Sequence, residues 1–435
     1  MRILLTLALL LAALSPTFSQ TPPTKTEREN ARTMLKTIKG DLEKYYYDPQ
    51  YRGMNLDERF KAANEKIEQA ESLAQLLGIV GQVLLDLNDS HTFFLPPGRT
   101  YKTEYGWQMK AIGDRCFVVA VKPNSDAETK GLKEGDEIIS IDGMKPTREN
   151  MWKLHYLYHG IRPRPGMRLV VIKPSGEEQQ LDVAAQVEQG KKVVDLNVMG
   201  QMYDSEDIVR EKENFARLNR HRSEVIGDAF VWKMSRFDLD PDEVKDMFGK
   251  IKKTKSLVLD LRGNGGGYVD TLLALIGNVF DKKVKVGDLK RRKDQTELIA
   301  KSRGNDAFTG KIVVLIDSES GSAAELFARV VQLEKRGTVI GDRSAGAVMR
   351  SRRYSHFIGD YKFIPYGVSI TDSDIIMTDG KSLEHVGVTP DELKLPSPAD
   401  LASKRDPVLA HALSLVGVDY TPEKAGALFP FEWRK

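Results

Sequence analysis

The spacing of apolar residues changes several times along the chain, and each change predicts a different kind of structure. Residues 26–48 and 55–88 place apolar positions at helical spacing among many Glu, Lys and Ala, which predicts a small helical domain. Between about residues 105 and 186, short apolar runs alternate with turn residues, which predicts strands. From about 225 to 395, strand-length runs alternate with helical spacing, which predicts a largely parallel sheet.

Three apolar runs in the last of these regions are each followed by a loop rich in small residues. The runs are SLVLDL from Ser256, KIVVLI from Lys311 and TVIG from Thr338, and their β-branched content is typical of buried strands. Because ligand sites form at the carboxyl ends of parallel strands, chemistry is expected first in the three loops that follow these runs.

Ser322 lies in the second of these loops, immediately before residues whose apolar spacing predicts a helix that begins at Ala323. A serine held between a strand end and a helix start exposes its hydroxyl on a tight turn. The free N–H of the next residue and the positive end of the helix then lie where an oxyanion would form. Ser322 is therefore a candidate nucleophile for acyl transfer, although a serine N-cap would explain the same position without chemistry.

The other two loops also contain residues suited to a binding site. In LDLRGNGGG, which runs from Leu259 to Gly267, Gly and Asn dominate after Leu261, so the backbone can approach a substrate and offer N–H groups. This loop lacks the glycine spacings of the nucleotide-binding motifs, which argues against nucleotide binding. The third loop, GDRSAGAVMR, runs from Gly341 to Arg350.

One string in the strand-rich region, GLKEGDEIISIDG from Gly131 to Gly143, resembles a PDZ domain, to which we assign residues 104–187. PDZ domains bind an extended peptide, often the C-terminus of a protein, as an added strand. The resemblance implies that Gly106, Trp107 and Gln108 line the substrate-binding groove. A degenerate PDZ domain that serves only as a spacer stays open as the alternative.

The three loops in this order, with a PDZ-like insertion before them, resemble the C-terminal-processing (tail-specific) peptidase superfamily. The resemblance covers roughly residues 26–395. It implies an α/β fold: a crotonase-like core with a mostly parallel sheet, an inserted β-rich PDZ domain and an N-terminal helical domain. It also implies that Ser322, the first residue of an S-A-A-E string, is the nucleophile. The N–H groups of Ala323 and of one glycine, Gly266 or Gly265, would then form the oxyanion hole.

The sequence departs from the tail-specific branch of this superfamily at the general base. That branch uses a lysine in the third loop, but the matching position here holds Ala347, which cannot accept a proton. A second branch, similar to tricorn protease, uses an adjacent Ser-His pair before the PDZ domain and a late glutamate. Ser90 and His91 in LNDSHT and Glu384 in LEHVGVTPD match these positions. The resemblance therefore implies that Glu384, Ser90 and His91 form a relay to Ser322.

The changes of pattern and the resemblance together divide the chain into six segments. These are a signal peptide (1–20), an N-terminal helical domain that carries Ser90 and His91 (26–98), the PDZ domain (104–187), a charged connector (188–224), the catalytic core (225–395) and a C-terminal extension (396–435). The first segment has a basic start, a short apolar centre and small residues at its end, as secretory signal peptides do. We therefore predict export to a bacterial periplasm or to the extracellular medium, without a transmembrane anchor.

Composition also bears on three further questions: nucleic-acid binding, disulfide bonds and metal sites. The 65 Lys and Arg are interspersed with 62 Asp and Glu and the net charge is +3, so no nucleic-acid partner is expected. Cys116 is the only cysteine of the sequence, which excludes an intramolecular disulfide. His155 and His159 are spaced as two metal ligands on a helix would be, but no third ligand is near in sequence, so aromatic packing is expected instead of a metal site. Glu325 is interpreted as a structural acid in a first helical turn.

We therefore predict an exported serine peptidase that forms an acyl-enzyme on Ser322, with His91 as the base and without any cofactor. Its partners would be peptides or proteins, including C-terminal tails presented by the PDZ domain. Two alternatives stay open: a catalytically decayed protein of the same fold that binds peptides or hydrophobic ligands, and an esterase that uses the same site. The sequence is compatible with an oligomer and does not determine the oligomeric state.

Overall fold

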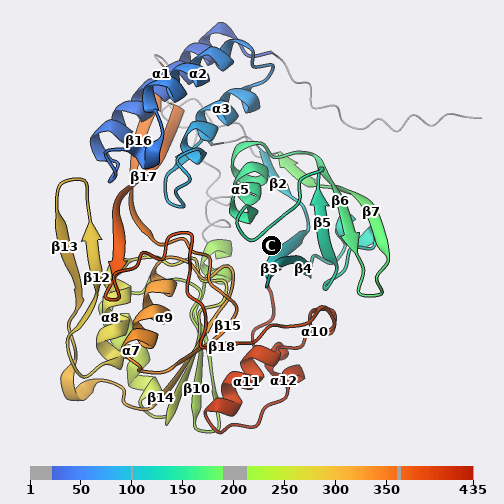
Figure 1. Ribbon diagram of the computed structural model, residues 1–435. Coiled ribbons are helices and arrows are strands. Elements are labelled where there is room, and N and C mark those ends of the chain that lie inside the picture. The colour runs from blue at the N-terminus through green and yellow to red at the C-terminus, as the bar shows by residue number, and fades with distance from the viewer. Residues whose placement is uncertain (1–21, 99–100, 190–212, 360–363, 435) are drawn as a thin grey trace, which may run out of the picture.

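The computed structural model describes residues 22–98, 101–189, 213–359 and 364–434. The expected signal peptide (1–20) and much of the expected connector (188–224) lie outside the described residues. Figure 1 shows three regions: a group of N-terminal helices, a small β-rich unit and a larger α/β unit. Of the helices within the described ranges, none combines the length and the hydropathy that a membrane span needs.

Three helices form the N-terminal region: α1 (Lys25–Tyr45), α2 (Leu56–Glu68) and α3 (Leu73–Leu85). A 3₁₀ turn, η1 (Tyr51–Gly53), lies between the first two. The helical stretch expected over 55–88 is split in two, because the Ser72 hydroxyl accepts the Gln75 N–H (3.3 Å) and caps a new helix.

These helices pack on an antiparallel sheet whose strands come from distant parts of the chain (Figure 1). The order of this sheet is β1 (Phe93–Leu95), β17 (Ile364–Met377), β12 (Val284–Lys290) and β13 (Gln295–Ala300), with β16 (Met349–Ile358) also paired to β17. Val368 and Ile370 of β17 join the core of the N-terminal helices, whereas Ile375 and Met377 join the main core. The sequence pattern does not predict this second sheet, because β17 buries serine and threonine side chains where a strand pattern would show apolar residues.

A six-stranded sheet forms the centre of the α/β unit, and it is mostly parallel as expected. Its order is β18 (Glu392–Leu393), β15 (Thr338–Gly341), β14 (Lys311–Ile316), β11 (Ser256–Asp260), β10 (Ala229–Lys233) and β9 (Arg222–Ile226). Every pair is parallel except β9 with β10 at the edge. The three apolar runs of the sequence are β11, β14 and β15, so the three loops after them leave the same edge of the sheet.

Helices cover both faces of this sheet, as a buried parallel sheet requires. On one face lie α7 (Pro241–Ile251), α8 (Val269–Val279) and α9 (Ala323–Leu333). On the other lie α11 (Pro407–Leu415) and α12 (Pro422–Leu428), which pack against Val258 and Leu315. Two short helices, η3 (Gly304–Asp306) and α10 (Pro398–Ala402), lie in connections. The segment 396–435, expected as an extension, therefore supplies one layer of the core.

Residues 101–189 form the β-rich unit, where the PDZ domain was expected. Five antiparallel strands follow one another in order: β3 (Trp107–Ile112), β4 (Arg115–Val121), β5 (Glu137–Ile141), β6 (Gly166–Ile172) and β7 (Glu178–Ala184). A separate pair, β2 (Tyr101–Glu104) and β8 (Gln186–Gln189), and three helical segments, α4 (Asp126–Thr129), α5 (Met151–His155) and the π-helical η2 (Tyr156–Ile161), complete the unit. Asp142 and Gly143 form the expected tight turn, with φ of 50° and 84°.

Candidate active site

Ser322 occupies the turn between β14 and α9. Its φ of 53° and ψ of −118° lie outside the regions that non-glycine residues prefer, so the surrounding structure holds this turn in a strained conformation. The backbone N–H donates to the carbonyl oxygen of Ala347 (2.9 Å) and to Oε2 of Glu325 (3.0 Å). Ser322 is the N-cap residue of α9 and forms a capping box with Glu325, so it has a structural role at the helix start. The strained backbone is the feature that a simple N-cap does not require.

Two N–H groups beside this serine have no acceptor within the described part of the chain: that of Ala323, the first residue of α9, and that of Gly265 in the glycine loop. The Gly266 N–H donates instead to Oδ1 of Asn264 (2.8 Å). Gly266 nevertheless packs on the serine turn, since a Cβ at this position would lie 2.6 Å from Cβ of Ser322 and 2.9 Å from the Ala323 nitrogen. Gly265 therefore has the N–H that is available to an oxyanion, whereas the lack of a side chain at Gly266 lets the glycine loop approach the serine turn closely.

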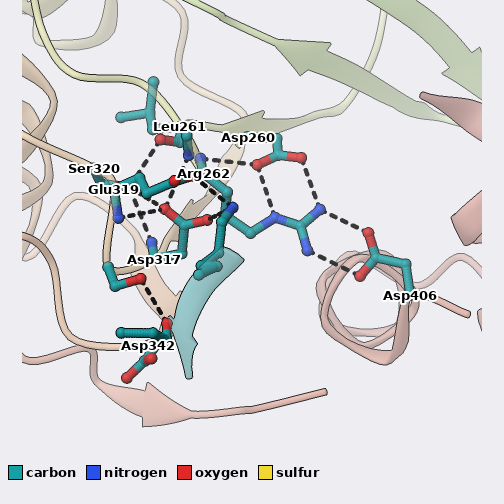
Figure 2. A network of polar contacts seen from close by, with 12 residues as sticks. Asp260, Leu261, Arg262, Asp317, Glu319, Ser320, Asp342 and Asp406 are labelled. Carbon is teal, nitrogen blue, oxygen red and sulfur yellow. Dashed lines mark hydrogen bonds and ion pairs between the residues drawn. The ribbon is translucent and has the colours of Figure 1, made fainter. Parts of the chain in front are cut away.

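A buried network of charges holds the glycine loop in place, as Figure 2 shows. The Arg262 guanidinium lies 2.8 Å from a carboxylate oxygen of Asp260, at the end of β11, and 2.7 Å from one of Asp406, before α11. Burial by itself would raise the pKa of Asp260, but the neighbouring cationic groups lower it below its usual value. The network therefore keeps an ionised carboxylate at the start of the loop.

Asp317, at the end of β14, connects the glycine loop to the β-rich unit. Its Oδ1 accepts the Gly263 N–H (2.9 Å), and its Oδ2 lies 2.6 Å from Nζ of Lys110 on β3. The Lys110 ammonium also pairs with Glu319 (2.9 Å). Burial would lower the pKa of Lys110, but the two carboxylates raise it above the usual range, so the lysine remains charged. The ion pairs of Lys110 therefore connect strand β3 to the loop that precedes Ser322.

Glu325 is fully buried in the first turn of α9 and accepts four hydrogen bonds. Its Oε1 accepts from the Ser344 hydroxyl (2.6 Å) and the Gly346 N–H (2.8 Å), and its Oε2 accepts from the N–H groups of Ser322 and Ala347 (3.0 Å each). Burial raises the pKa of this carboxyl to about 7, while the four donors oppose the rise. The structural role expected for Glu325 therefore includes holding the serine turn against the third loop.

We expect the Glu325 carboxyl to make the stability of the fold depend on pH. Its pKa is about 7 in the fold against an ordinary value of 4.5, so between these values the folded state binds one proton more than the unfolded chain. The stability of the protein relative to a Glu325→Gln variant should be greatest below the lower value and fall by up to about 3 kcal/mol as the pH rises through the upper one. Urea unfolding of both proteins at about pH 4, 6 and 8 measures this difference, and a pH-independent difference would contradict the assignment.

A series of hydrogen bonds joins Glu384, Ser90 and His91. The Ser90 Oγ lies 2.8 Å from Oε2 of Glu384 and 2.7 Å from Nδ1 of His91, and the Ser90 N–H donates to Oε1 of Glu384 (2.9 Å). A hydroxyl has a single proton, and here it donates that proton to the carboxylate, so its oxygen accepts Nδ1–H of the imidazole. Nε2 of His91 is then unprotonated and available as a base.

Asp89 fixes the turn that carries this histidine, and it was not among the site residues predicted from the sequence. Its Oδ1 accepts the His91 N–H (2.9 Å) and the Thr371 hydroxyl of β17 (2.7 Å), and its Oδ2 accepts the Tyr46 hydroxyl (2.9 Å). Burial lowers the pKa of His91 and outweighs the opposite effect of the Asp89 charge, so the ring is neutral at neutral pH. The string Asn-Asp-Ser-His contained a usable signal, because an aspartate often accepts the N–H two residues further on.

Two consecutive residues of the third loop connect the serine turn to this relay. The Ala347 carbonyl oxygen accepts the Ser322 N–H (2.9 Å), and the Val348 N–H donates to Oε2 of Glu384 (2.9 Å). Ala347 occupies the position at which the sequence excludes a lysine base. Loops from distant parts of the chain therefore meet at one site, at the edge of the parallel sheet.

The residues expected to bind substrate lie at the start of β3, in the β-rich unit. Gly106 has a φ of 73°, and a Cβ there would lie 2.6 Å from Cβ of Ser125. Among the described residues, neither Gly106 nor the following Trp107 and Gln108 bond to the serine turn. His155 stacks on a second histidine of the same helical segment, and the described residues contain no group of three or more His, Cys, Asp or Glu side chains arranged to hold a metal ion.

Comparison with known proteins gives one family match and several relatives. Residues 231–393 match the model of peptidase family S41. The tail-specific protease of Haemophilus influenzae is 25% identical over 324 residues, which cover 70% of this chain and 43% of that protein. A probable CtpA-like serine protease of Staphylococcus haemolyticus is 25% identical over 301 residues, covering 67% of this chain and 52% of that protein. The chain therefore spans about half the length of these curated relatives.

Two solved structures share the fold. Mature CPAF in complex with lactacystin superposes with a TM-score of 0.63 at 16% identity, covering 86% of this chain and 95% of that one. The photosystem II D1 C-terminal processing protease superposes with a TM-score of 0.52 at 19% identity, covering 91% and 99%. At these identities the likeness concerns the fold alone.

Proposed function

We propose, since this chain belongs to peptidase family S41, that it is a serine peptidase with Ser322 as the nucleophile and His91 as the general base. The observation that carries the proposal is the series of hydrogen bonds from Glu384 through Ser90 to the imidazole, which the third loop joins to the strained serine turn. A nucleophile, a base and a group that orients the base are the components that acyl transfer requires.

In the first half of the reaction, Nε2 of His91 accepts the hydroxyl proton of Ser322 while Oγ forms a bond to the carbonyl carbon of the substrate peptide. The electrons of the carbonyl double bond move to its oxygen and give a tetrahedral oxyanion. The imidazolium then transfers its proton to the amide nitrogen as the C–N bond breaks, which releases the amine and leaves an ester on the serine. Water attacks this ester in the second half, His91 again takes and returns a proton, and the acid product leaves.

The relay supports these proton transfers electrostatically. The imidazolium formed in each half reaction bears Nδ1–H against Ser90 Oγ, which in turn donates to Glu384. Burial holds the pKa of Glu384 above its ordinary value, and the hydrogen bonds from Ser90 oppose this rise and favour the carboxylate. The carboxylate thereby stabilises the developing positive charge through the intervening hydroxyl, as the aspartate of a triad does directly.

The oxyanion is stabilised by the N–H groups of Ala323 and Gly265. Both are without an acceptor among the described residues, and the first lies at the positive end of α9. A donor that is already free and fixed requires no reorganisation when the charge develops, and each such donor is typically worth about 100- to 1,000-fold in rate.

The β-rich unit, which resembles a PDZ domain, is proposed to present extended peptide ends to this site. Its strand β3, with Gly106, Trp107 and Gln108 at the start, is fastened by Lys110 to the loop before the nucleophile. Peptides and protein tails are therefore the substrate class that we assign. Export to a periplasm or the extracellular medium is part of the same proposal and rests on residues 1–20.

A fluorophosphonate probe tests the proposal, because it labels only an activated serine. We expect labelling at Ser322 in the wild-type protein and its loss in both Ser322→Ala and His91→Ala. An Ala347→Lys variant should label no faster than the wild type if histidine is the base. Mass spectrometry of the labelled peptide identifies the site.

The outcomes separate the alternatives. A folded wild-type protein that does not label would identify the decayed peptide- or hydrophobe-binding protein. Labelling, together with hydrolysis of small esters but of no peptide or unfolded protein, would identify the esterase. Labelling that survives His91→Ala would show that another group activates the serine.

A further inference from the structure

A second histidine, His385, follows the glutamate of the relay and lies against the turn that carries the proposed base. We call residues 88–91 the base turn. Nε2 of His385 is 2.7 Å from the carbonyl oxygen of Asn88 and 3.5 Å from Oε1 of Glu384. Because a carbonyl oxygen can only accept, Nε2 of His385 carries a proton and donates it to Asn88. The ring therefore binds the backbone of the base turn directly.

The main chain of His385 binds the opposite partner, the third loop. Its N–H donates to the carbonyl oxygen of Gly346 (2.7 Å). The Gly346 N–H in turn donates to Oε1 of Glu325 (2.8 Å), whose Oε2 accepts the Ser322 N–H (3.0 Å). One residue thus holds the base turn with its side chain and the loop beside the nucleophile with its main chain.

The backbone around His385 is closely packed on the third loop. A Cβ at Gly346 would lie 3.1 Å from the carbonyl carbon of His385 and 3.1 Å from the nitrogen of Val386. The N–H groups of Val386 and Gly387 both donate to the Leu383 carbonyl oxygen (3.0 and 2.9 Å), which closes a tight turn. The ring of His385 therefore projects from a well-supported segment of backbone.

The two residues joined by this hydrogen bond both adopt a left-handed backbone conformation. The φ of His385 is 62° and that of Asn88 is 48°. Non-glycine residues rarely adopt such values, and strained residues of this kind cluster at active sites. Glycine would turn the chain at position 385 without strain, but it has no side chain that could bind Asn88.

The base turn is held from two sides. Asp89 bonds to Thr371 of β17, on the side of the antiparallel sheet. On the side of the third loop, Glu384 accepts the Ser90 N–H and the His385 ring donates to the backbone just before Asp89. Without this ring, the hydrogen bonds of Glu384 would be left to hold that side of the turn.

We propose that His385 is a positioning residue of the active site, whose imidazole holds the base turn against the third loop and so aligns Nε2 of His91 with the Ser322 hydroxyl. The inference rests on the proposed function and deepens it, because it assigns a residue outside the relay to the alignment of base and nucleophile. A displacement of about 1 Å between reacting groups can cost about 100-fold in rate. Loss of the His385 ring should therefore slow the reaction although no reacting group is removed.

A pair of variants with the same amide group tests this proposal. His385→Gln places an amide N–H close to the position of Nε2, whereas the side chain of His385→Asn is one methylene shorter and does not reach the Asn88 carbonyl oxygen. Asparagine also tolerates a left-handed backbone, so the variant should fold. For peptide hydrolysis we expect kcat of the Asn variant to fall about 10- to 100-fold with KM within about threefold, and the Gln variant to stay within about threefold of the wild type.

Fluorophosphonate labelling separates a positioning role from a structural one. The Asn variant should label more slowly than the wild type but reach the same final extent, because every molecule keeps a competent serine. A structural defect would instead lower the final extent, since a fraction of the molecules would be misfolded. His411→Asn is the matched control, because this histidine on α11 pairs with Glu392 (2.7 Å), away from the site, and should change neither quantity.

Hydrogen exchange measured by mass spectrometry tests the same contact without using activity. Amide protons of the base turn should exchange at least about threefold faster in His385→Asn than in the wild type, because the turn loses one of its supports. The Gln variant should exchange at the wild-type rate. The proteins are otherwise unmodified and are compared in their full-length form.

An Asn variant that labels at the wild-type rate, or equal losses in the Gln and Asn variants, would overturn the inference. So would a lower final extent of labelling with an unchanged rate. Failure of the proposed function is distinguishable, because a folded wild-type protein would then not label at all. In that case the exchange measurement still decides whether His385 holds the base turn.

Discussion

Replacing His91 with alanine is expected to lower kcat/KM for a peptide substrate by about 10⁴- to 10⁶-fold while the protein remains folded. The ring supplies the base whose Nε2 the relay leaves unprotonated. Steady-state kinetics and a thermal melt of the purified variant measure the two parts of this expectation. A His411→Ala variant provides a control for loss of a histidine elsewhere.

The same relay predicts a graded effect at Ser90. Ser90→Ala removes the hydroxyl between the imidazole and Glu384 and should cost about 10²- to 10⁴-fold, whereas Ser90→Thr keeps a hydroxyl and should recover part of the loss. The acid limb of the rate should follow the deprotonation of His91, whose pKa burial lowers below 6.5. Equal activities for the alanine and threonine variants, with an unshifted acid limb, would show that Ser90 has no part in proton transfer.

Replacing Gly266 with alanine is expected to lower the rate of fluorophosphonate labelling at least about 100-fold, although no reacting group is removed. Its φ is 92°, and the added Cβ would lie 2.6 Å from Cβ of Ser322 and 2.9 Å from the Gly321 carbonyl oxygen. The serine turn must therefore shift, and the backbone strain adds about 1–3 kcal/mol of instability.

Gly265→Ala is the matched control for this prediction. A Cβ at Gly265 meets no atom within 4 Å, its φ is not positive, and alanine keeps the N–H proposed to bind the oxyanion. Labelling by a small probe should stay within about tenfold of the wild type. If Gly265→Ala lost as much activity as Gly266→Ala, the loop would tolerate no side group at all and the distinction between the two glycines would be wrong.

Local pattern was sufficient for much of the fold. The strands β11, β14 and β15 and the start of α9 at Ala323 followed from apolar runs and helical spacing, because each element buries one continuous set of apolar residues. The antiparallel sheet was missed, since β17 buries polar residues, one of which, Thr371, bonds to the 89–92 turn. The layer formed by α11 was also missed, since no local signal says which face of a distant sheet a helix covers.

The candidate site was predictable only through resemblance. No local pattern predicts that Ser90 forms a hydrogen bond with Glu384, because the two residues are 294 positions apart in the sequence. The hydrogen-bond partners of Asp89 and Glu325 could not be predicted from the sequence, for a different reason. Each of these buried carboxylates is satisfied by donors from separate segments, and a donor set of that kind exists only after folding.

Strand β17 contributes to two hydrophobic cores, so the N-terminal helices and the α/β unit should unfold cooperatively. Its first half, with Val368 and Ile370, completes the hydrophobic core of the N-terminal helices, and its second half, with Ile375 and Met377, completes the main core. Opening of the N-terminal helices would therefore expose the first half of a strand whose second half is held in the main core, so the two regions are coupled through β17. The turn that carries His91 bonds to Thr371 of this strand, so the amide protons of that turn and of the second half of β17 should exchange in a single opening event.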